Sequence, residues 1–246
     1  MRVSVELIPR SVEAMNAQLD EVQAFARVDT INVPDILRFE LRAWDACGLA
    51  RGRGYRAVPH LRAIDVDPGA PLPFAESLDT HGLDEVLVIA GDAPPDMSKQ
   101  VFETSSEALI RRLKRERPHL RVYAALDPYR QGFIAERDYL LRKLDAGADG
   151  LFTQPFFDLR LLEVWGDLLA PLGVPVFWGA TSVTTTKSAR YWTTRNRAVL
   201  PASFAPTLAH SRELAGGILS FAAARDDNVY FMPIRASSRA YLEGIL

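Results

Sequence analysis

Polar side chains stand in or just after a series of short apolar runs, where they could carry out chemistry. Glu6 lies inside the apolar run Val3–Ile8, and burying an unpaired carboxylate is energetically costly. Burial also raises a carboxyl pKa, so Glu6 is a candidate proton donor near neutral pH. The alternative is that Glu6 pairs with an arginine or faces solvent at a sheet edge. Since no neighbouring residue is an obvious partner, the sequence favours the proton donor.

A histidine and a Gly-Asp pair accompany two other apolar runs. His60 lies inside the run Tyr55–Ile64, where a lone histidine is more typical of a hydrogen-bonded core group than of a catalyst. Gly91 and Asp92 directly follow the run Glu85–Ala90. A glycine lets a ligand approach the backbone closely, and an aspartate can hydrogen-bond a heterocycle. The alternative for this pair is an aspartate-initiated turn.

An amide stands next to two aromatic residues in Thr153-Gln154-Pro-Phe-Phe157. A glutamine can both donate to and accept from a planar heterocyclic amide, and an aromatic ring such as Phe157 can stack on it. At least one of the two rings is expected in the core instead. Other polar residues at the ends of apolar runs are Asn32, Asp35, Asp65, Asp127, Tyr129, Thr181 and Arg235.

Composition excludes several classes of protein. The 246 residues include 29 lysines and arginines against 31 aspartates and glutamates, which argues against a dedicated nucleic-acid binder. The four histidines are scattered and there is one cysteine, Cys47, so we expect neither a metal site nor an intramolecular disulfide. No long uncharged apolar run or signal peptide is recognisable, which predicts a cytoplasmic protein without a membrane span.

The apolar runs themselves predict eight strands that alternate with helices. Most are apolar at consecutive positions, which is typical of parallel strands covered on both faces. We therefore predict an α/β fold, a (β/α)8 TIM barrel forming one domain over residues 1–246. An open doubly wound sheet is the alternative, weakened by the lack of a G-x-G-x-x-G motif. The expected strands are Val3–Ile8, Val28–Val33, Tyr55–Ile64, Glu85–Ala90, Leu120–Ala125, Asp149–Thr153, Val174–Trp178 and Asn228–Met232.

Helices are expected between the strands. Ser11 is a candidate N-cap for a helix whose apolar residues share one face. Helical patterns also cover Phe133–Leu144, which Gly147 is expected to end, and Asp158–Leu169. The hydroxyl-rich stretch Ser182–Ser188 is interpreted as a solvated loop. Further helices are expected over Pro206–Ala224 and Ala236–Leu246, with Arg111–Arg117 on a solvated helix face.

Motifs in this order along the chain resemble those of the methylenetetrahydrofolate reductase family. The most specific is the block Arg142–Asp149, read RKLDAGAD, followed by TQPFFD at Thr153–Asp158. Shorter matches are the acidic strand VELIP at residues 5–9, PHL at 59–61, GDAPP at 91–95 and IRA at 234–236. The resemblance covers nearly the whole chain.

The resemblance implies a barrel enzyme of one-carbon metabolism. The implied reaction reduces 5,10-methylene-tetrahydrofolate to 5-methyl-tetrahydrofolate with NADH or NADPH, and FAD carries the hydride in flavin-dependent members. Glu6 is the implied acid that protonates the folate, and the implied substrate-binding residues are Asp92, Gln154, Arg235 and Phe157. The implied cofactor-binding positions are Asn32, His60, Gly91, Asp92, Glu136, Arg142 and Lys143.

Departures from the family pattern fall mainly on the flavin side. Ala90 replaces an arginine, Asn32–Asp35 replaces a threonine-tyrosine-glycine run, and Leu126–Tyr129 replaces a tyrosine-proline-glutamate stretch. Either FAD is held differently, or NAD(P)H passes its hydride straight to the folate.

Two other interpretations, and the oligomeric state, stay open. The chain is alternatively a non-catalytic folate- or flavin-binding accessory protein. A different barrel enzyme, such as an aldolase or lyase, ranks low because no predicted strand ends in a lysine. A small-molecule folate is the expected partner, with neither nucleic acid nor membrane, and a homo-oligomer is one option.

Overall fold

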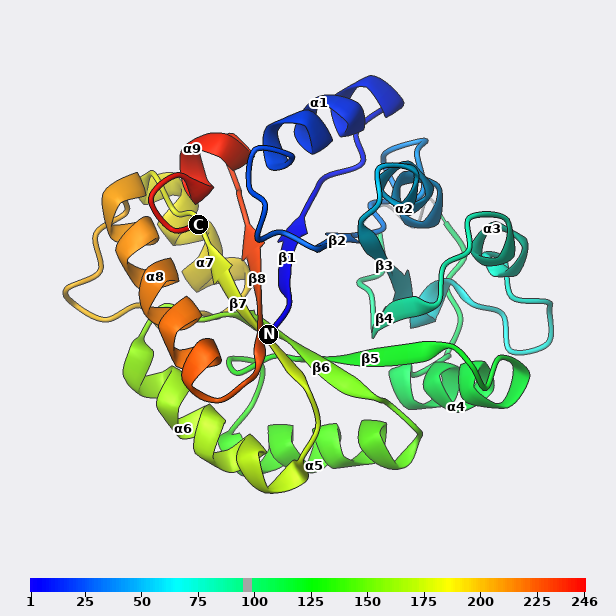
Figure 1. The fold of residues 1–246 in the computed structure, drawn as a ribbon. Helices are drawn as coiled ribbons and strands as arrows, with labels where there is room; N and C mark the ends of the chain where they lie inside the picture. The colour runs from blue at the N-terminus through cyan, green and yellow to red at the C-terminus, as the bar shows by residue number, and fades with distance from the viewer. Residues whose placement is uncertain (95–98) are drawn as a thin grey trace.

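The chain folds into a closed barrel of parallel strands surrounded by helices (Figure 1). The structure, a computed structural model, describes residues 1–94 and 99–246. Over these residues eight strands pair in chain order, and β8 pairs with β1 to close the sheet. The predicted (β/α)8 barrel is confirmed, and the open doubly wound sheet is excluded. Pro95, the last residue of the GDAPP motif, lies outside the described residues.

Each predicted strand is present within a few residues of its expected bounds. Because these strands are buried on both faces, continuous apolar runs in the sequence predicted them correctly. The strands are β1 (Val3–Glu6), β2 (Thr30–Val33), β3 (Arg56–Arg62), β4 (Glu85–Ile89), β5 (Arg121–Leu126), β6 (Gly150–Pro155), β7 (Val176–Thr181) and β8 (Asn228–Met232).

Helices cover the outside of the barrel. Ser11 caps the first of them, accepting from the backbone N–H of Ala14, as predicted. The expected loop over Ser182–Ser188 is wrong at its end, because Thr185 caps a helix that begins at Thr186. The helices are α1 (Val12–Val22), α2 (Ala43–Gly52), α3 (Ala75–Thr80), α4 (Ser106–Glu116), α5 (Phe133–Asp145), α6 (Leu159–Leu169), α7 (Thr186–Arg195), α8 (Leu208–Ala224) and α9 (Ser238–Leu242). Within the described ranges, every helix is too short or too polar to span a bilayer.

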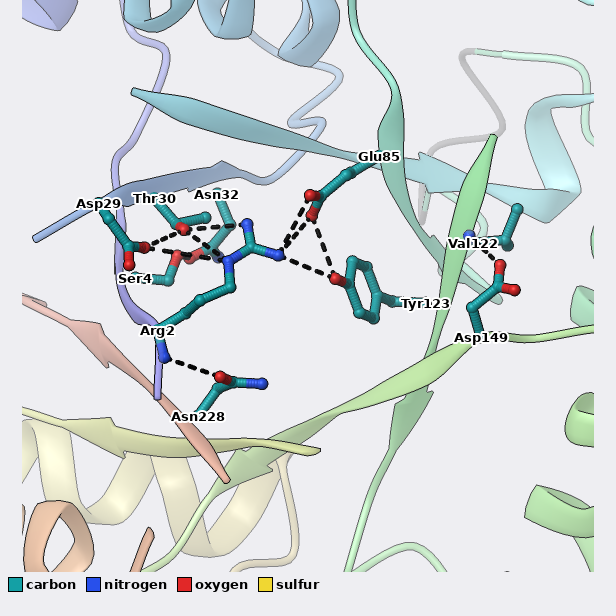
Figure 2. Close-up of polar contacts among 10 residues, drawn as sticks. All are labelled: Arg2, Ser4, Asp29, Thr30, Asn32, Glu85, Val122, Tyr123, Asp149 and Asn228. Atoms are coloured by element: carbon teal, nitrogen blue, oxygen red, sulfur yellow. Dashed lines mark hydrogen bonds and ion pairs between the residues drawn. The ribbon is translucent and has the colours of Figure 1, made fainter. Parts of the chain in front are cut away.

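The inside of the barrel is layered. Its middle holds a buried aromatic and aliphatic cluster that includes Phe152 and Phe177, whose rings stack with centroids 4.1 Å apart. At the end where the strands begin, Arg2 and Glu85 form a polar layer (Figure 2). Because the middle is filled by side chains, the barrel is a solid core and ligands must bind at its carboxyl-terminal rim.

Gly179 shows how tightly this interior is filled. A Cβ at Gly179 would lie 2.8 Å from Cε1 of Tyr230, whose hydroxyl donates to the Thr153 carbonyl at 2.6 Å. Gly179→Ala is therefore expected to lower the free energy of unfolding by about 1–3 kcal/mol, measured by urea denaturation. Gly216→Ala in α8 is the matched control, since no atom counted among the described residues lies within 4 Å of its added Cβ. Helix propensity should stabilise that variant slightly, and equal losses in both would contradict the packing argument.

Candidate functional site

A cavity of about 250 Å³ opens at the end of the barrel where the strands finish. Leu87, Ile89 and Met232 form apolar parts of its lining. Its polar lining includes Glu6, His60, Asp127, Arg130, Lys143 and Gln154. These residues lie far apart in the sequence, and the carboxyl ends of β1, β3, β5 and β6 bring most of them together. This is the face where barrels of this type carry their active sites.

Glu6 ends β1 and is 8% exposed. Asn32, its register partner on β2, donates from Nδ2 to Glu6 Oε2 at 3.1 Å. Burial raises the pKa of the Glu6 carboxyl to about 8, although the Asn32 hydrogen bond acts in the opposite direction. At neutral pH Glu6 therefore carries a proton that it can donate, which is the state required of a general acid.

His60 is a neutral neighbour of this acid. Burial lowers the pKa of its imidazole to about 3, so it carries no charge at neutral pH. Its Nε2 lies 3.2 Å from Asn32 Nδ2. Since the amide nitrogen is a donor, Nε2 accepts this hydrogen bond and the ring proton resides on Nδ1.

Gln154 reaches the cavity from an irregular part of the sheet. The register between β6 and β7 shifts between Phe152 and Pro155, and such irregularities often redirect side chains beside active sites. Thr153 fixes the strand here, because its Oγ1 accepts from the Gly179 backbone N–H at 2.9 Å. The half-buried Gln154 amide thus faces the same cavity as Glu6.

A charged cluster closes the β5 side of the cavity. Arg130 donates to both carboxylate oxygens of the fully buried Glu136, each at 2.7 Å from Nη2. Gln131 Nε2 donates to the same carboxylate at 2.9 Å. Lys143 Nζ donates to the Ala125 carbonyl at 2.6 Å, and burial lowers its pKa to about 8.

These contacts test whether FAD fits. Three of the implied flavin positions lie on α5. Glu136 and Lys143 are engaged inside the chain, and Arg142 is exposed beside Glu107 at 3.6 Å. The cavity is also smaller than the clefts of about 300–1,000 Å³ that bury drug-sized ligands. It matches one pterin or nicotinamide ring, so the remainder of a dinucleotide, whether FAD or NAD(P)H, would lie outside it. Glu136 and Lys143 are therefore committed to contacts within the chain and do not form the FAD contacts that the resemblance implies.

The predicted Gly91-Asp92 pair lies beside the cavity rather than in its lining. Gly91 has a φ of +85°, and a Cβ there would lie 2.9 Å from Cγ1 of Ile64, so backbone geometry alone explains the glycine. Asp92 is exposed, and its carbonyl accepts from Arg62 Nη2 at 2.7 Å.

Two further predicted residues, Arg235 and Phe157, also lie outside the cavity lining. Arg235 follows β8 with a φ of +57° and is exposed. Phe157 is buried in a separate aromatic cluster, with ring centroids 5.2 Å from Trp192 and 5.9 Å from Phe204. The structure thus gathers Glu6, His60, Gln154 and Lys143, with Asn32 directly behind.

Tyr230 and Arg130 are among the polar lining residues that sequence reasoning missed. Tyr230 sits between the inward-facing Asn228 and Met232 of β8, so the two-residue period of a strand could have placed it inside. Arg130 has no such signal, since only the folded loop brings it to Glu136.

A second cavity, of about 330 Å³, lies between the loops after β2 and β3. Its two arginines are already paired, Arg42 with Asp35 and Arg62 with Asp65. The strand-end cavity, which holds Glu6 and Gln154, is therefore a better candidate for chemistry than this one.

Comparison with known proteins identifies relatives of this chain. The family described as methylenetetrahydrofolate reductase matches residues 18–215. The 5,10-methylenetetrahydrofolate reductase of Escherichia coli K12 is 26% identical over 178 residues, 69% of this chain and 60% of the relative. That of Salmonella typhimurium is 26% identical over 130 residues, 52% of this chain and 44% of the relative. The matches thus span less than two thirds of these relatives.

Solved structures share the fold at low identity. A Clostridium thermocellum protein described as binding two copies of 5-methyl-5,6,7,8-tetrahydrofolic acid has a TM-score of 0.66 and 10% identity, over 98% of this chain and 93% of that one. Dihydropteroate synthase of Thermus thermophilus has a TM-score of 0.52 and 16% identity, over 99% and 90%. The family match extends over most of the barrel and includes Asn32, His60 and Gln154. This chain therefore belongs to the methylenetetrahydrofolate reductase family.

Proposed function

We propose that this chain reduces 5,10-methylene-tetrahydrofolate to 5-methyl-tetrahydrofolate with a hydride taken directly from NADH or NADPH. The observation that carries the proposal is a protonated, buried Glu6 in a ring-sized cavity that it shares with the Gln154 amide. Family membership supports the reaction class. The C. thermocellum neighbour, described as binding 5-methyl-tetrahydrofolate, supports a folate as the ligand.

Each residue has a distinct part in the proposed reaction. The methylene carbon of the substrate bridges the folate nitrogens N5 and N10. Glu6 donates its proton to N10, and the bond between N10 and the methylene carbon then breaks to leave an iminium ion at N5. The hydride from the reduced nicotinamide converts that carbon to the methyl group, which balances the proton and the two electrons. Gln154 orients the pterin through donor and acceptor hydrogen bonds. The neutral His60 adds no positive charge beside the developing cation.

The absorption spectrum of the purified protein, combined with an assay, tests this route. We expect a colourless preparation that oxidises NADH or NADPH only when methylene-tetrahydrofolate is present. Flavin bands that copurify with the protein and are bleached by NADH would overturn direct transfer. Tight folate binding without turnover would instead favour the accessory, non-catalytic function. In the proposed enzyme, residues 1–246 act as one cytoplasmic catalytic domain.

A further inference from the structure

Asn32, the register partner of Glu6 on β2, makes more hydrogen bonds than a residue that only fills space would need. Asn32 is fully buried, and its amide meets three polar side chains. Its Oδ1 accepts from Ser4 Oγ at 2.7 Å, while Nδ2 lies 3.1 Å from Glu6 Oε2 and 3.2 Å from His60 Nε2. Both amide hydrogens and the amide oxygen therefore have partners, from strands β1 and β3 on either side of β2.

We infer that Asn32 is a positioning residue for the general acid: Ser4 fixes the orientation of the Asn32 amide, and this amide holds the Glu6 carboxyl and the Nδ1-protonated form of His60. This inference rests on the proposed function, because it takes from it the role of Glu6 as the general acid. It assigns Asn32 and His60 a part in the acid site in place of the flavin contacts implied for them by resemblance.

The orientation of the Asn32 amide decides whether it lowers or raises the pKa of Glu6. With Nδ2 toward Glu6, Asn32 donates to the carboxyl, which favours the ionised form and limits the rise of the Glu6 pKa. With the amide reversed, Oδ1 would instead accept from protonated Glu6 and raise its pKa further. In the observed orientation the Ser4 hydroxyl donates to Oδ1, a bond that reversal of the amide would break. Titration of Glu6 can therefore distinguish the two orientations.

Other titratable groups face the same cavity and set the background for this titration. They are His60 on β3, Asp127 after β5, Arg130 in the following loop, Lys143 on α5 and Tyr230 on β8. His60 is neutral across the working range, with a pKa of about 3, and burial raises the pKa of Tyr230 far out of it. Lys143 has a pKa of about 8 and therefore titrates in the same pH range as Glu6. The measurement must for this reason observe the Glu6 carboxyl itself.

Difference infrared spectroscopy on the ligand-free protein supplies that measurement. The band of the protonated Glu6 carboxyl is identified as the one lost in Glu6→Gln, and is then followed against pH. Asn32→Leu removes the hydrogen bond at similar volume, and we expect the midpoint to rise by about one pH unit. Ser4→Ala frees the amide to reverse, and should raise the midpoint by a smaller amount. Thr30→Val is the matched control, because Thr30 lies on the same strand but bonds to Arg2, and the midpoint should stay unchanged.

The outcomes separate this inference from the proposed function. A midpoint that does not move in Asn32→Leu reduces Asn32 to a structural residue and overturns the inference. A midpoint that falls shows the reversed amide, which also overturns it. Should Asn32→Leu fail to fold, Ser4→Ala decides alone, with a rise in support and no change against. Since the titration needs no substrate, its result stands even if the protein proves to have no reductase activity.

Discussion

Glu6→Gln is expected to lower the rate of methylene-tetrahydrofolate reduction by about 10²-fold or more. The proton that Glu6 supplies assists the breaking of a carbon–nitrogen bond, and general acid catalysis of this kind contributes about 10²–10⁴-fold. Glutamine keeps the shape and the contact with Asn32 but has no acidic proton. Folate binding should change little, so the loss is expected in kcat, measured by stopped-flow or steady-state oxidation of the nicotinamide.

The pH dependence adds a second signature of the same group. Glu6 must be protonated to act, and its pKa is about 8. The rate of the wild-type protein should therefore hold below this pH and fall above it. In Glu6→Gln the residual rate should lose that alkaline decline. A profile unchanged by the substitution would assign the decline to another group, such as Lys143.

Stability provides the control for this variant. Burial raises the Glu6 pKa from its ordinary value of 4.5 to about 8, so folding keeps a proton that the unfolded chain releases between these values. Its stabilising contribution is complete below pH 4.5 and is lost as the pH rises through 8. At neutral pH Glu6→Gln should thus be at least as stable as the wild type. Glu213→Gln, whose side chain is 84% exposed, should change neither rate nor stability, and a full rate in Glu6→Gln would remove the assigned mechanism.

The barrel was readable from the sequence because its strands are apolar on both faces. Every residue of β1, including Glu6, is buried, so a charged residue within such a run stands out as an anomaly. The helix α2 gave no comparable signal. Its sequence AWDACGLARG is rich in alanine and glycine, and its buried residues are mostly small, so the apolar stripe was not recognisable.

The site was predictable only in part, since strand ends are local features and loops are not. Gln154 lies near the end of β6 and faces the cavity, whereas Asp92 and Arg235 follow strands but belong to exposed loop segments. The role of Asn32 depends on Ser4 and His60, each 28 residues away in the chain. Only the register of adjacent parallel strands brings these three side chains together.

The amino-terminal end of the barrel holds the ion pair whose loss should cost the most stability (Figure 2). Arg2 Nη1 donates to Glu85 at 2.8 and 3.1 Å and to the Tyr123 hydroxyl oxygen at 3.0 Å. The two charged side chains are only 13% and 8% exposed. Because solvent cannot replace the lost partner, Arg2→Met should lower the free energy of unfolding by about 3–5 kcal/mol, measured by chemical denaturation.

A double variant separates the cost of an unpaired charge from the value of the pair itself. Among the described residues, Arg2→Met leaves the buried Glu85 carboxylate only the Tyr123 hydroxyl as a side-chain donor. Adding Glu85→Leu removes that charge, so the double variant should regain most of the lost stability, as apolar replacements of buried ion pairs often do. Arg53→Met is the matched control, because its partner Asp20 is 67% exposed and such surface pairs contribute about 0–1 kcal/mol. Two results would contradict this argument: a loss of stability in Arg2→Met no larger than in the control, or no recovery of stability on adding Glu85→Leu. In either case the barrel does not depend on neutralising Glu85, and its amino-terminal end is stabilised by the buried cluster that includes Phe152 and Phe177.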